Sequence, residues 1–356
     1  MLNSKRWISK VLATIRWRWG VLLLGLVFVW SVMNDVQLGE WYAQTLYPPL
    51  AKILSWLSSL LPFSIGDCFI YGSIIGLIIY LLIAFIRRKE RWKAVRRTVE
   101  YLAWVYVWFY MAWGLNYFRT DFYHRTDTKR VKYAEERFNS FLEAYTDSLN
   151  ASWCTPTDTI DINAIKQATL AGYQKLSPQF GLVKPTHPLT PKPMLCPRLM
   201  AAVGVTGYMG PFFNEFHVNK LLRPTQYPAT YAHEMAHMLS VSNEAEANLY
   251  SFLVCSSSSD PSIRFSGYFA LFPHVMRNAR RLLDKSAYRD WLKTVRPEIQ
   301  DLYTEEAAYW HSLYSRQIGN AQDFIYNLFL RSNKISSGTA NYSEVIGLLI
   351  ALNYFS

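Results

Sequence analysis

The first third of the chain alternates between long apolar runs and short basic stretches. The apolar runs cover about residues 17–36, 69–86 and 101–118, and the second contains 18 residues without a charge. A helix needs about 20 mostly apolar residues to cross the hydrocarbon core of a bilayer. We therefore predict three transmembrane helices. Residues 37–67 are expected to form an amphipathic interfacial segment, or a re-entrant turn, between the first two.

Two of these runs admit another interpretation. The first follows a basic start, as the apolar part of a signal peptide does, but residues 34–37 (NDVQ) offer no small-residue cleavage site. The third is rich in aromatic residues and could be a buried helix of a soluble domain. We favour an uncleaved anchor and a third span.

Basic residues predict how the spans are oriented. The N-terminus and the 87–97 loop are rich in Lys and Arg, whereas the segment between the first two spans contains only Lys52. Cytoplasmic loops carry such an excess of positive charge. The N-terminus is therefore expected in the cytoplasm, and three crossings of the cytoplasmic membrane place the region after residue 118 on the periplasmic or extracellular side. The expected domains are a membrane domain, 1–118, and a water-soluble domain, 119–356.

The C-terminal region has the amphipathic patterns of a helical domain. Its length of roughly 240 residues suffices for a hydrophobic core. The patterns predict a Pro-rich connection over 177–198 and one or two short strands over 199–219. The predicted helices cover residues 133–150, 161–176, 229–240, 243–257, 263–284, 286–314, 321–332 and 341–353.

Composition and charge narrow the class of protein. The chain has 356 residues, of which 51% are hydrophobic and 18% charged, and a formal net charge of +11. This composition excludes disordered, collagen-like and disulfide-scaffold proteins. Residues 1–118 hold 13 basic and 5 acidic side chains, so the positive surplus flanks the apolar runs. We therefore expect membrane lipid, and no nucleic acid, as a partner. Whether Cys154 and Cys196 form a disulfide is left open.

The sequence HEMAH at residues 233–237 carries the candidate chemistry. It is an HExxH pattern. On a helix, residues i and i+4 share a face, so His233 and His237 can bind one Zn²⁺. Glu234 is then placed to act as general base toward a zinc-activated water. The alternative is a pair of surface histidines without a metal.

A catalytic zinc needs a third protein ligand and an open fourth position. The candidates are Glu244 and Glu246, which follow on the next predicted helix. Asn243 and Glu246 have the spacing of a capping box, which gives Glu246 a structural role and leaves Glu244 to face the metal. Asn248, one turn later, is a candidate hydrogen-bond partner of a ligand. Solvated helix charges are the simpler alternative for both carboxylates.

The two motifs together resemble those of the gluzincin-type zinc peptidases, in which HExxH is followed by Glu-x-x-Ala-Asn or Glu-x-x-Ala-Asp on the next helix. This resemblance implies a zincin-like fold, one zinc per chain and Glu244 as the third ligand. One departure is Ser240, which stands three residues after the second histidine, where glycine is expected.

Most of the chain is also similar to an uncharacterised family of bacterial membrane proteins, a domain of unknown function with a predicted zinc-peptidase motif. The matching stretches are PFSIGD (62–67), GYMGPFFNEFHVN (207–219), HEMAH, EAEAN, YNLFLRSN and GTANYSEVIGLL. The expected fold is therefore mainly α: three N-terminal transmembrane helices, then a zincin-like, mostly helical α+β domain with a small sheet.

Several further residues are weaker candidates. In zincin enzymes a strand near the metal binds the substrate backbone, and the resemblance suggests residues 211–219 for this role. Glu215 is a candidate for binding a substrate amine or for a structural salt bridge. Candidates for stabilising an oxyanion are His217, Tyr208, Tyr268 and Tyr342, although each of these is more often a packing residue.

These observations predict a membrane-anchored zinc metalloendopeptidase that acts on a peptide or protein substrate. A first alternative is a membrane-tethered scaffold or binding protein with a structural or vestigial zinc site, against which the intact Glu234 argues. A second is a zinc hydrolase of a non-peptide amide, because the motif specifies water activation rather than the acyl group. The oligomeric state is left open.

Overall fold

The structure is a computed structural model that describes residues 2–87, 91–131, 135–335, 337–338 and 344–355. It divides into two compact units. Unit 1 consists of Met1–Ser58, Ile65–Arg119 and Pro211–Asn214, and unit 2 of Ser59–Ser64, Thr120–Gly210 and Glu215–Ser356. The main division follows Arg119, and each unit also includes a short segment from beyond its main range.

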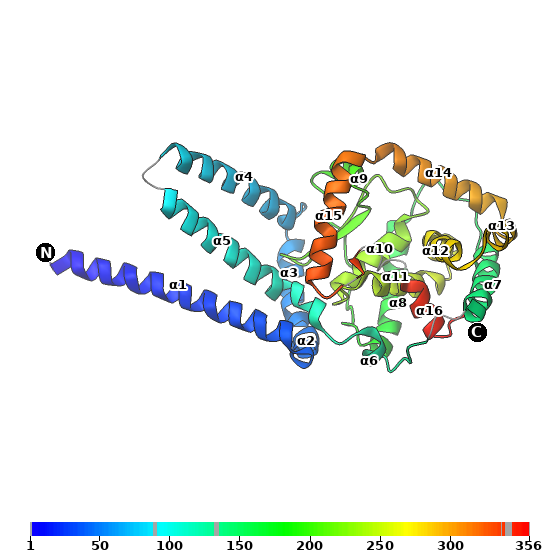
Figure 1. Ribbon diagram of the computed structural model, residues 1–356, viewed down its shortest axis with the longest axis horizontal. Coiled ribbons are helices and arrows are strands. Elements are labelled where there is room, and N and C mark those ends of the chain that lie inside the picture. The colour runs from blue at the N-terminus through cyan, green and yellow to red at the C-terminus, as the bar shows by residue number, and fades with distance from the viewer. Residues whose placement is uncertain (1, 88–90, 132–134, 336, 339–343, 356) are drawn as a thin grey trace. The chain divides into compact units, whose positions relative to one another are not determined.

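Unit 1 is built on long helices (Figure 1). Helix α5 (Arg91–Ala112) packs against both α1 (Leu2–Asn34) and α4 (Ile65–Ile86). The contact between α1 and α5 is close at Gly25, where a Cβ would stand 2.8 Å from the Val107 side chain. Glycine at this position therefore lets the two helices approach.

The segment between α1 and α4 is helical and amphipathic. It contains α2 (Val36–Trp41), a π-helical turn over Tyr42–Leu46 and α3 (Tyr47–Ser59). Helix α3 buries Tyr47, Ala51 and Leu54 and exposes Ile53, Trp56 and Leu57. In the same unit, the Asn214 side chain donates to the carbonyl oxygen of Ala51 and to Ser55 Oγ, which fixes the 211–214 segment on α3.

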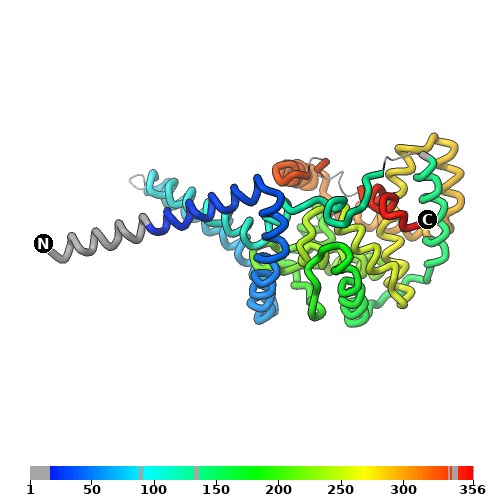
Figure 2. Tube along the Cα trace, turned by 90° about the horizontal axis from the view of Figure 1, so that it is seen from below, coloured from blue at the N-terminus to red at the C-terminus, as the bar shows by residue number. Residues whose placement is uncertain are grey.

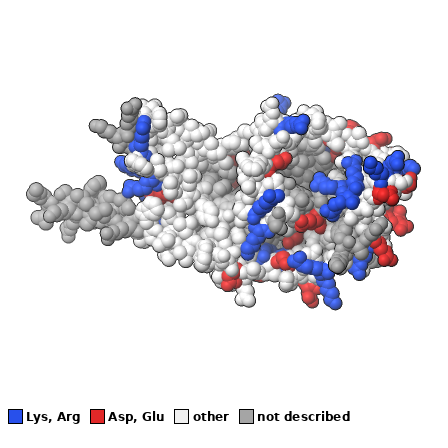
Figure 3. Space-filling view, in the orientation of Figure 1, with Lys and Arg blue, Asp and Glu red and all other residues white. Residues whose placement is uncertain are grey.

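Two described helices are long and apolar enough to cross a membrane, over Trp17–Asn34 and Ile65–Ile86. The predicted third span over 101–118 is not one of them. Its helix, α5, begins at Arg91 and ends at Ala112, so its first turns are charged and its apolar part is shorter than the roughly 20 residues that a span needs. The face of the long helices drawn in Figure 3 is mostly uncharged, with Lys and Arg gathered near one end.

Unit 2 is organised around three buried helices (Figure 1, Figure 2). These are α10 (Tyr227–Met238), α11 (Glu244–Ser256) and α12 (Pro261–Leu282), which pack against one another, while α11 also contacts α8 (Ile162–Phe180) and α16 (Val345–Ala351). The other helices are α6 (Phe122–Arg125), α7 (Glu135–Ala151), α9 (Pro197–Ala202), α13 (Lys285–Thr294), α14 (Pro297–Leu313) and α15 (Arg316–Ser332). The mainly helical character expected from the sequence is confirmed.

The predicted strands form one antiparallel hairpin. Strand β1 (Gly207–Gly210) pairs with β2 (Glu215–Val218), and Tyr208 stands opposite His217. On the other edge of β2, the Lys192 N–H donates to the Phe216 carbonyl oxygen at 2.8 Å. Residues 211–219, which were predicted to hold a substrate backbone, include β2, and its second edge is therefore partly occupied. Helix α10 packs against both strands.

Prolines explain two differences from the predicted helices. Residues 286–314 form two helices, because Pro297 interrupts the pattern and starts α14 in its first turn. Helix α8 continues through Pro178 and ends at Gly181, whose φ of +62° is a left-handed conformation that glycine adopts readily. The last predicted helix begins with residues 341–343, which lie outside the described part of the chain. Cys154 and Cys196 are both free thiols.

Candidate metal centre

The two histidines of the HExxH pattern lie on α10. Pro228 occupies the first turn of this helix, where a residue without an N–H group is tolerated. Tyr231 and Met235 are fully buried and anchor the helix in the core. Because His233 and His237 are four residues apart, their imidazoles lie on one face of α10.

Three donor atoms meet beside this face. The Nε2 atoms of His233 and His237 are 3.2 Å apart, and Glu244 Oε2 is 3.1 Å from the first and 3.5 Å from the second. A tetrahedral zinc with bonds of about 2.0–2.1 Å needs ligand atoms that stand about 3.3 Å apart. Two imidazole nitrogens and a carboxylate oxygen are also donor types that zinc accepts. The three side chains therefore fit this ion in both spacing and chemistry.

The turn between α10 and α11 directs Glu244 toward the histidines. Asn243 is the N-cap of α11, and its Oδ1 accepts a hydrogen bond from the Glu246 N–H at 3.1 Å. Glu244 is consequently the first residue of the helix. Ser240 has a φ of +73°, a left-handed conformation that favours glycine. Ser240 is the position at which the resemblance to the gluzincin-type peptidases implies glycine, and serine adopts this conformation at some energetic cost.

Each imidazole is held through its other ring nitrogen. His233 Nδ1 is 2.8 Å from Asn248 Oδ1, and His237 Nδ1 is 2.7 Å from the Val241 carbonyl oxygen. Both partners accept hydrogen bonds, so Nδ1 carries the proton in each ring. The Nε2 atom of each ring therefore faces the other two candidate metal-binding atoms. This arrangement orients both rings for a shared cation.

Burial and mutual attraction set the acidity of the cluster. Burial disfavours a charge on Glu244, but the nearby imidazoles of His237 and His233 outweigh it and hold the pKa of Glu244 well below its usual range. Burial also disfavours a charge on His237, but the Glu244 carboxylate raises the pKa of His237 to about 9. A cation bound at this centre would replace a proton on His237, as metal ions do when they bind imidazole ligands.

Glu234 lies next to the cluster, with β1 against it. Burial raises the pKa of its carboxyl group to about 7, although His233 and His237 act in the opposite direction. Its Oε2 atom is buried and has no hydrogen-bond partner among the described residues. A Cβ at Gly207 would stand 2.5 Å from Glu234 Oε1, so only glycine allows β1 to come this close. A carboxylate oxygen of this kind can accept a proton near neutral pH.

A tyrosine from a distant helix completes the surroundings of Glu244. The Tyr326 hydroxyl, on α15, donates to Glu244 Oε1 at 2.8 Å. This hydrogen bond holds the carboxylate in the rotation that turns Oε2 toward the histidines. Sequence reasoning missed this contact, because Tyr326 is separated from Glu244 by 82 positions and no local pattern connects them.

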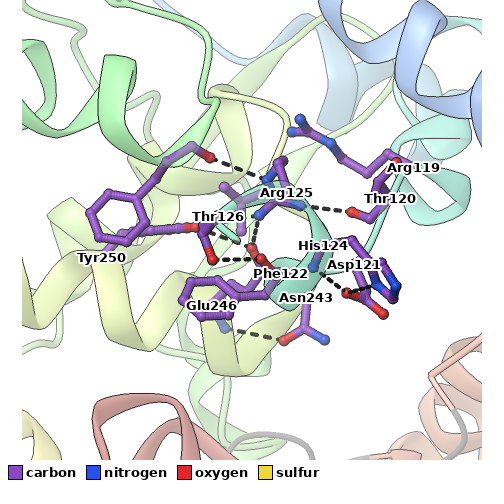
Figure 4. A network of polar contacts seen from close by, with 12 residues as sticks. Arg119, Thr120, Asp121, Phe122, His124, Arg125, Thr126, Asn243, Glu246 and Tyr250 are labelled. Carbon is purple, nitrogen blue, oxygen red and sulfur yellow. Dashed lines mark hydrogen bonds and ion pairs between the residues drawn. The ribbon is translucent and has the colours of Figure 1, made fainter. Parts of the chain in front are cut away.

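Glu246 lies in a separate buried network (Figure 4). The Arg125 guanidinium forms an ion pair with Glu246 Oε2 and lies 3.3 Å from the Tyr250 hydroxyl oxygen. It also donates to the carbonyl oxygens of Phe180 and Thr120, at 3.1 and 2.8 Å. Burial disfavours the charge of Arg125, but the Glu246 carboxylate more than compensates and raises the pKa of Arg125. The network ties the first turn of α11 to α6 and to the end of α8.

The remaining candidates make other contacts. Glu215 Oε2 accepts a hydrogen bond from a buried serine hydroxyl at 2.8 Å. The His217 ring stacks on Tyr208 of the neighbouring strand, with ring centroids 4.2 Å apart. Tyr268, on α12, packs against the hydrophobic core. Tyr342 lies outside the described residues.

A further histidine near the centre carries no sequence signal. His274 lies on α12, and burial, Arg277 and His233 together lower its pKa to about 4. His233 makes the smallest of these three contributions. Its position 41 residues after His233 has no ligand spacing, so only the packing of α12 against α10 reveals it.

The chain belongs to a known protein family. A family model described as "Protein of unknown function (DUF3810)" matches residues 42–350. The match covers α3 to α15, the hairpin and all three clustered donors. No curated protein and no solved structure matches the chain.

Proposed function

We propose that this chain is a membrane-anchored, zinc-dependent metallopeptidase. The observation that carries the proposal is the spacing of the His233, His237 and Glu244 donor atoms, at 3.1 to 3.5 Å from one another. Beside them lies the buried Glu234 carboxylate, whose Oε2 has no hydrogen-bond partner in the described part of the chain. A structural zinc site would use four protein ligands, whereas three ligands with an adjacent base are typical of a catalytic one.

The roles of the residues follow from their positions. His233, His237 and Glu244 would hold the ion, and Asn248 and Tyr326 orient two of these ligands. Zinc would supply Lewis-acid polarisation of the substrate carbonyl and acidify a water molecule. Glu234 accepts the proton of the attacking water and returns it to the leaving amine. Strand β1, whose Gly207 lies against Glu234, is the strand that we propose for binding the substrate backbone.

The proposed location is the cytoplasmic membrane, with a cytoplasmic N-terminus. Two apolar helices support the anchoring, and the excess of Lys and Arg at the start of the chain and before α5 supports the orientation. Crossings by α1 and α4 alone would return the chain to the cytoplasmic side. A periplasmic or extracellular unit 2 therefore requires a third crossing, and α5, which packs against α4 but has a short apolar part, is the helix available for it. Reporter fusions at the C-terminus, one active only outside the cytoplasm and one only inside it, test this placement.

Metal analysis of the purified full-length chain tests the centre. We expect about one zinc per chain, lost in His237→Ala and Glu244→Ala but retained in Glu246→Ala, whose carboxylate faces Arg125. Glu234→Gln should retain zinc and lose hydrolysis of a peptide library. Loss of zinc in Glu234→Gln would indicate a structural role for this residue. Absence of zinc in the wild type, after zinc is supplied, would refute the proposal.

A further inference from the structure

Helix α15 has two opposite faces of different character. At about 100° per residue, Gly319, Tyr326 and Leu330 share one face, and through Tyr326 this face reaches the metal ligand Glu244. The other face is an exposed apolar surface, which we name the α15 ridge. It consists of Ile318, Phe324, Ile325 and Leu328, which are 48%, 65%, 65% and 54% exposed.

Positive charge lies at both ends of the α15 ridge. Arg316 begins the helix and Arg331 lies in its last turn, and both are exposed, as is Lys334 just beyond it. Asp323 is the one acidic residue of the helix. An apolar face between basic ends matches the headgroup region of an anionic bilayer, where the apolar side chains enter the acyl boundary and the cations remain among phosphates.

We propose that the α15 ridge docks on the surface of the membrane in which the chain is anchored. The inference rests on the membrane anchoring of the proposed function, and it does not depend on zinc. Because the anchor holds unit 2 near a bilayer, docking is intramolecular and requires little intrinsic affinity. Docking would stabilise the position of α15 and with it the hydrogen bond from Tyr326 to Glu244. The candidate metal centre would then lie close to the lipid surface.

Lipid-borne quenchers test this contact in the full-length chain. The four native cysteines are replaced (Cys68, Cys154 and Cys196 by serine, Cys255 by alanine), and Ile325→Cys carries an environment-sensitive fluorophore. The protein is reconstituted in bilayers of phosphatidylcholine and phosphatidylglycerol that contain a spin-labelled lipid. Ile79→Cys on α4 is the reference for membrane insertion, and the exposed Ala287→Cys on α13 is the reference for solvent.

The three labelled positions distinguish a failure of the docking proposal from a failure of the membrane anchoring. We expect quenching at positions 79 and 325 and none at 287. If the label at position 79 is quenched but the label at position 325 is not, the docking is refuted and the anchoring stands. If the label at position 79 is not quenched, the anchoring is refuted, and the docking with it.

A second variant tests whether the ridge causes the contact. Leu328→Asp, in the chain labelled at Ile325→Cys, should lower the ratio of docked to undocked protein at least about tenfold, because it removes the transfer of an apolar side chain. Ala287→Asp is the matched control and should leave the ratio unchanged. Replacing phosphatidylglycerol by phosphatidylcholine should also weaken docking. Energy transfer between labels on two chains, without lipid quenching, would assign the ridge to a second copy and overturn the proposal.

Discussion

At the scale of single residues, Arg125 is where we expect the largest loss of stability. The side chains of Arg125 and Glu246 are 6% and 9% exposed. Removing one partner of a buried ion pair leaves an uncompensated charge and costs about 3–5 kcal/mol. Arg125→Met should therefore lower the free energy of unfolding by this amount, as measured by denaturant unfolding of the solubilised chain.

The double variant Arg125→Met with Glu246→Leu is the control for this prediction. It removes both charges, so it should be more stable than the single variant Arg125→Met. Recovery should be incomplete, because the Phe180 and Thr120 carbonyl oxygens still lose their donor. If the double variant were as unstable as the single one, the loss would come from packing and not from the unpaired Glu246.

The residues of the candidate centre differ in how far the sequence could reveal them. His233, His237 and Glu244 lie within 12 residues, so helical periodicity and a cap at Asn243 suffice to bring them together. Arg125 and Tyr326 reach the same helix from 121 and 82 positions away. No local spacing encodes such contacts, because they depend on how whole helices pack.

At the scale of elements, helices were predicted well where periodicity agrees with a local start signal, such as the proline in the first turn of α10 and the Asn243 cap of α11. The failures have specific causes. The aromatic residues of 101–118 form an apolar run in the sequence, but the helix over them starts at Arg91 and ends at Ala112. Proline at 297 splits one predicted helix, whereas proline at 178 is accommodated inside another. Tertiary contacts decide between these outcomes, and a single sequence does not show them.

The contact between β1 and α10 leads to a prediction about Gly207. Gly207→Ala places a methyl group 2.5 Å from Glu234 Oε1, so the carboxylate must move. We expect hydrolysis to fall by about 10²-fold or more, since small displacements of a catalytic group have effects of this size. Zinc content should be unchanged, because the three atoms nearest to a Cβ at this position all belong to Glu234, which is not one of the proposed ligands.

Gly72→Ala on α4 is the matched control, because its Cβ would meet no described atom within 4 Å. It should leave both zinc content and hydrolysis as in the wild type. Loss of zinc in Gly207→Ala would show that β1 supports the ligands as well as Glu234, contrary to the prediction.

At the scale of the whole molecule, composition indicates the division of the chain but not its details. The change from apolar to polar sequence near residue 119 coincides with the main division between the units. Composition does not reveal that residues 59–64 belong to unit 2 or that residues 211–214 belong to unit 1. Their assignment depends on long-range contacts such as those of Asn214 with α3.

The stability of the folded chain should depend on pH through Glu306 of α14. This side chain is 3% exposed, and neither of its carboxylate oxygens has a well-aligned hydrogen bond among the described residues, although Thr225 and Gln226 lie near enough to oppose part of the effect of burial. Burial raises the pKa of Glu306 from 4.5 to about 7. The folded state therefore binds the proton more tightly than the unfolded state, so stability falls as the pH rises from 4.5 through 7. The loss amounts to at most about 3 kcal/mol.

Glu306→Gln isolates this contribution, because the amide does not titrate while every other group in the molecule remains. The difference in unfolding free energy between Glu306→Gln and the wild type should be smallest at about pH 4.5 and should grow in favour of Gln up to about pH 8. Titration of the histidines changes both proteins equally and cancels in the difference. A difference that stayed constant over this range would mean that Glu306 ionises in the folded chain as it does in water, and that unit 2 opens enough at α14 to hydrate it.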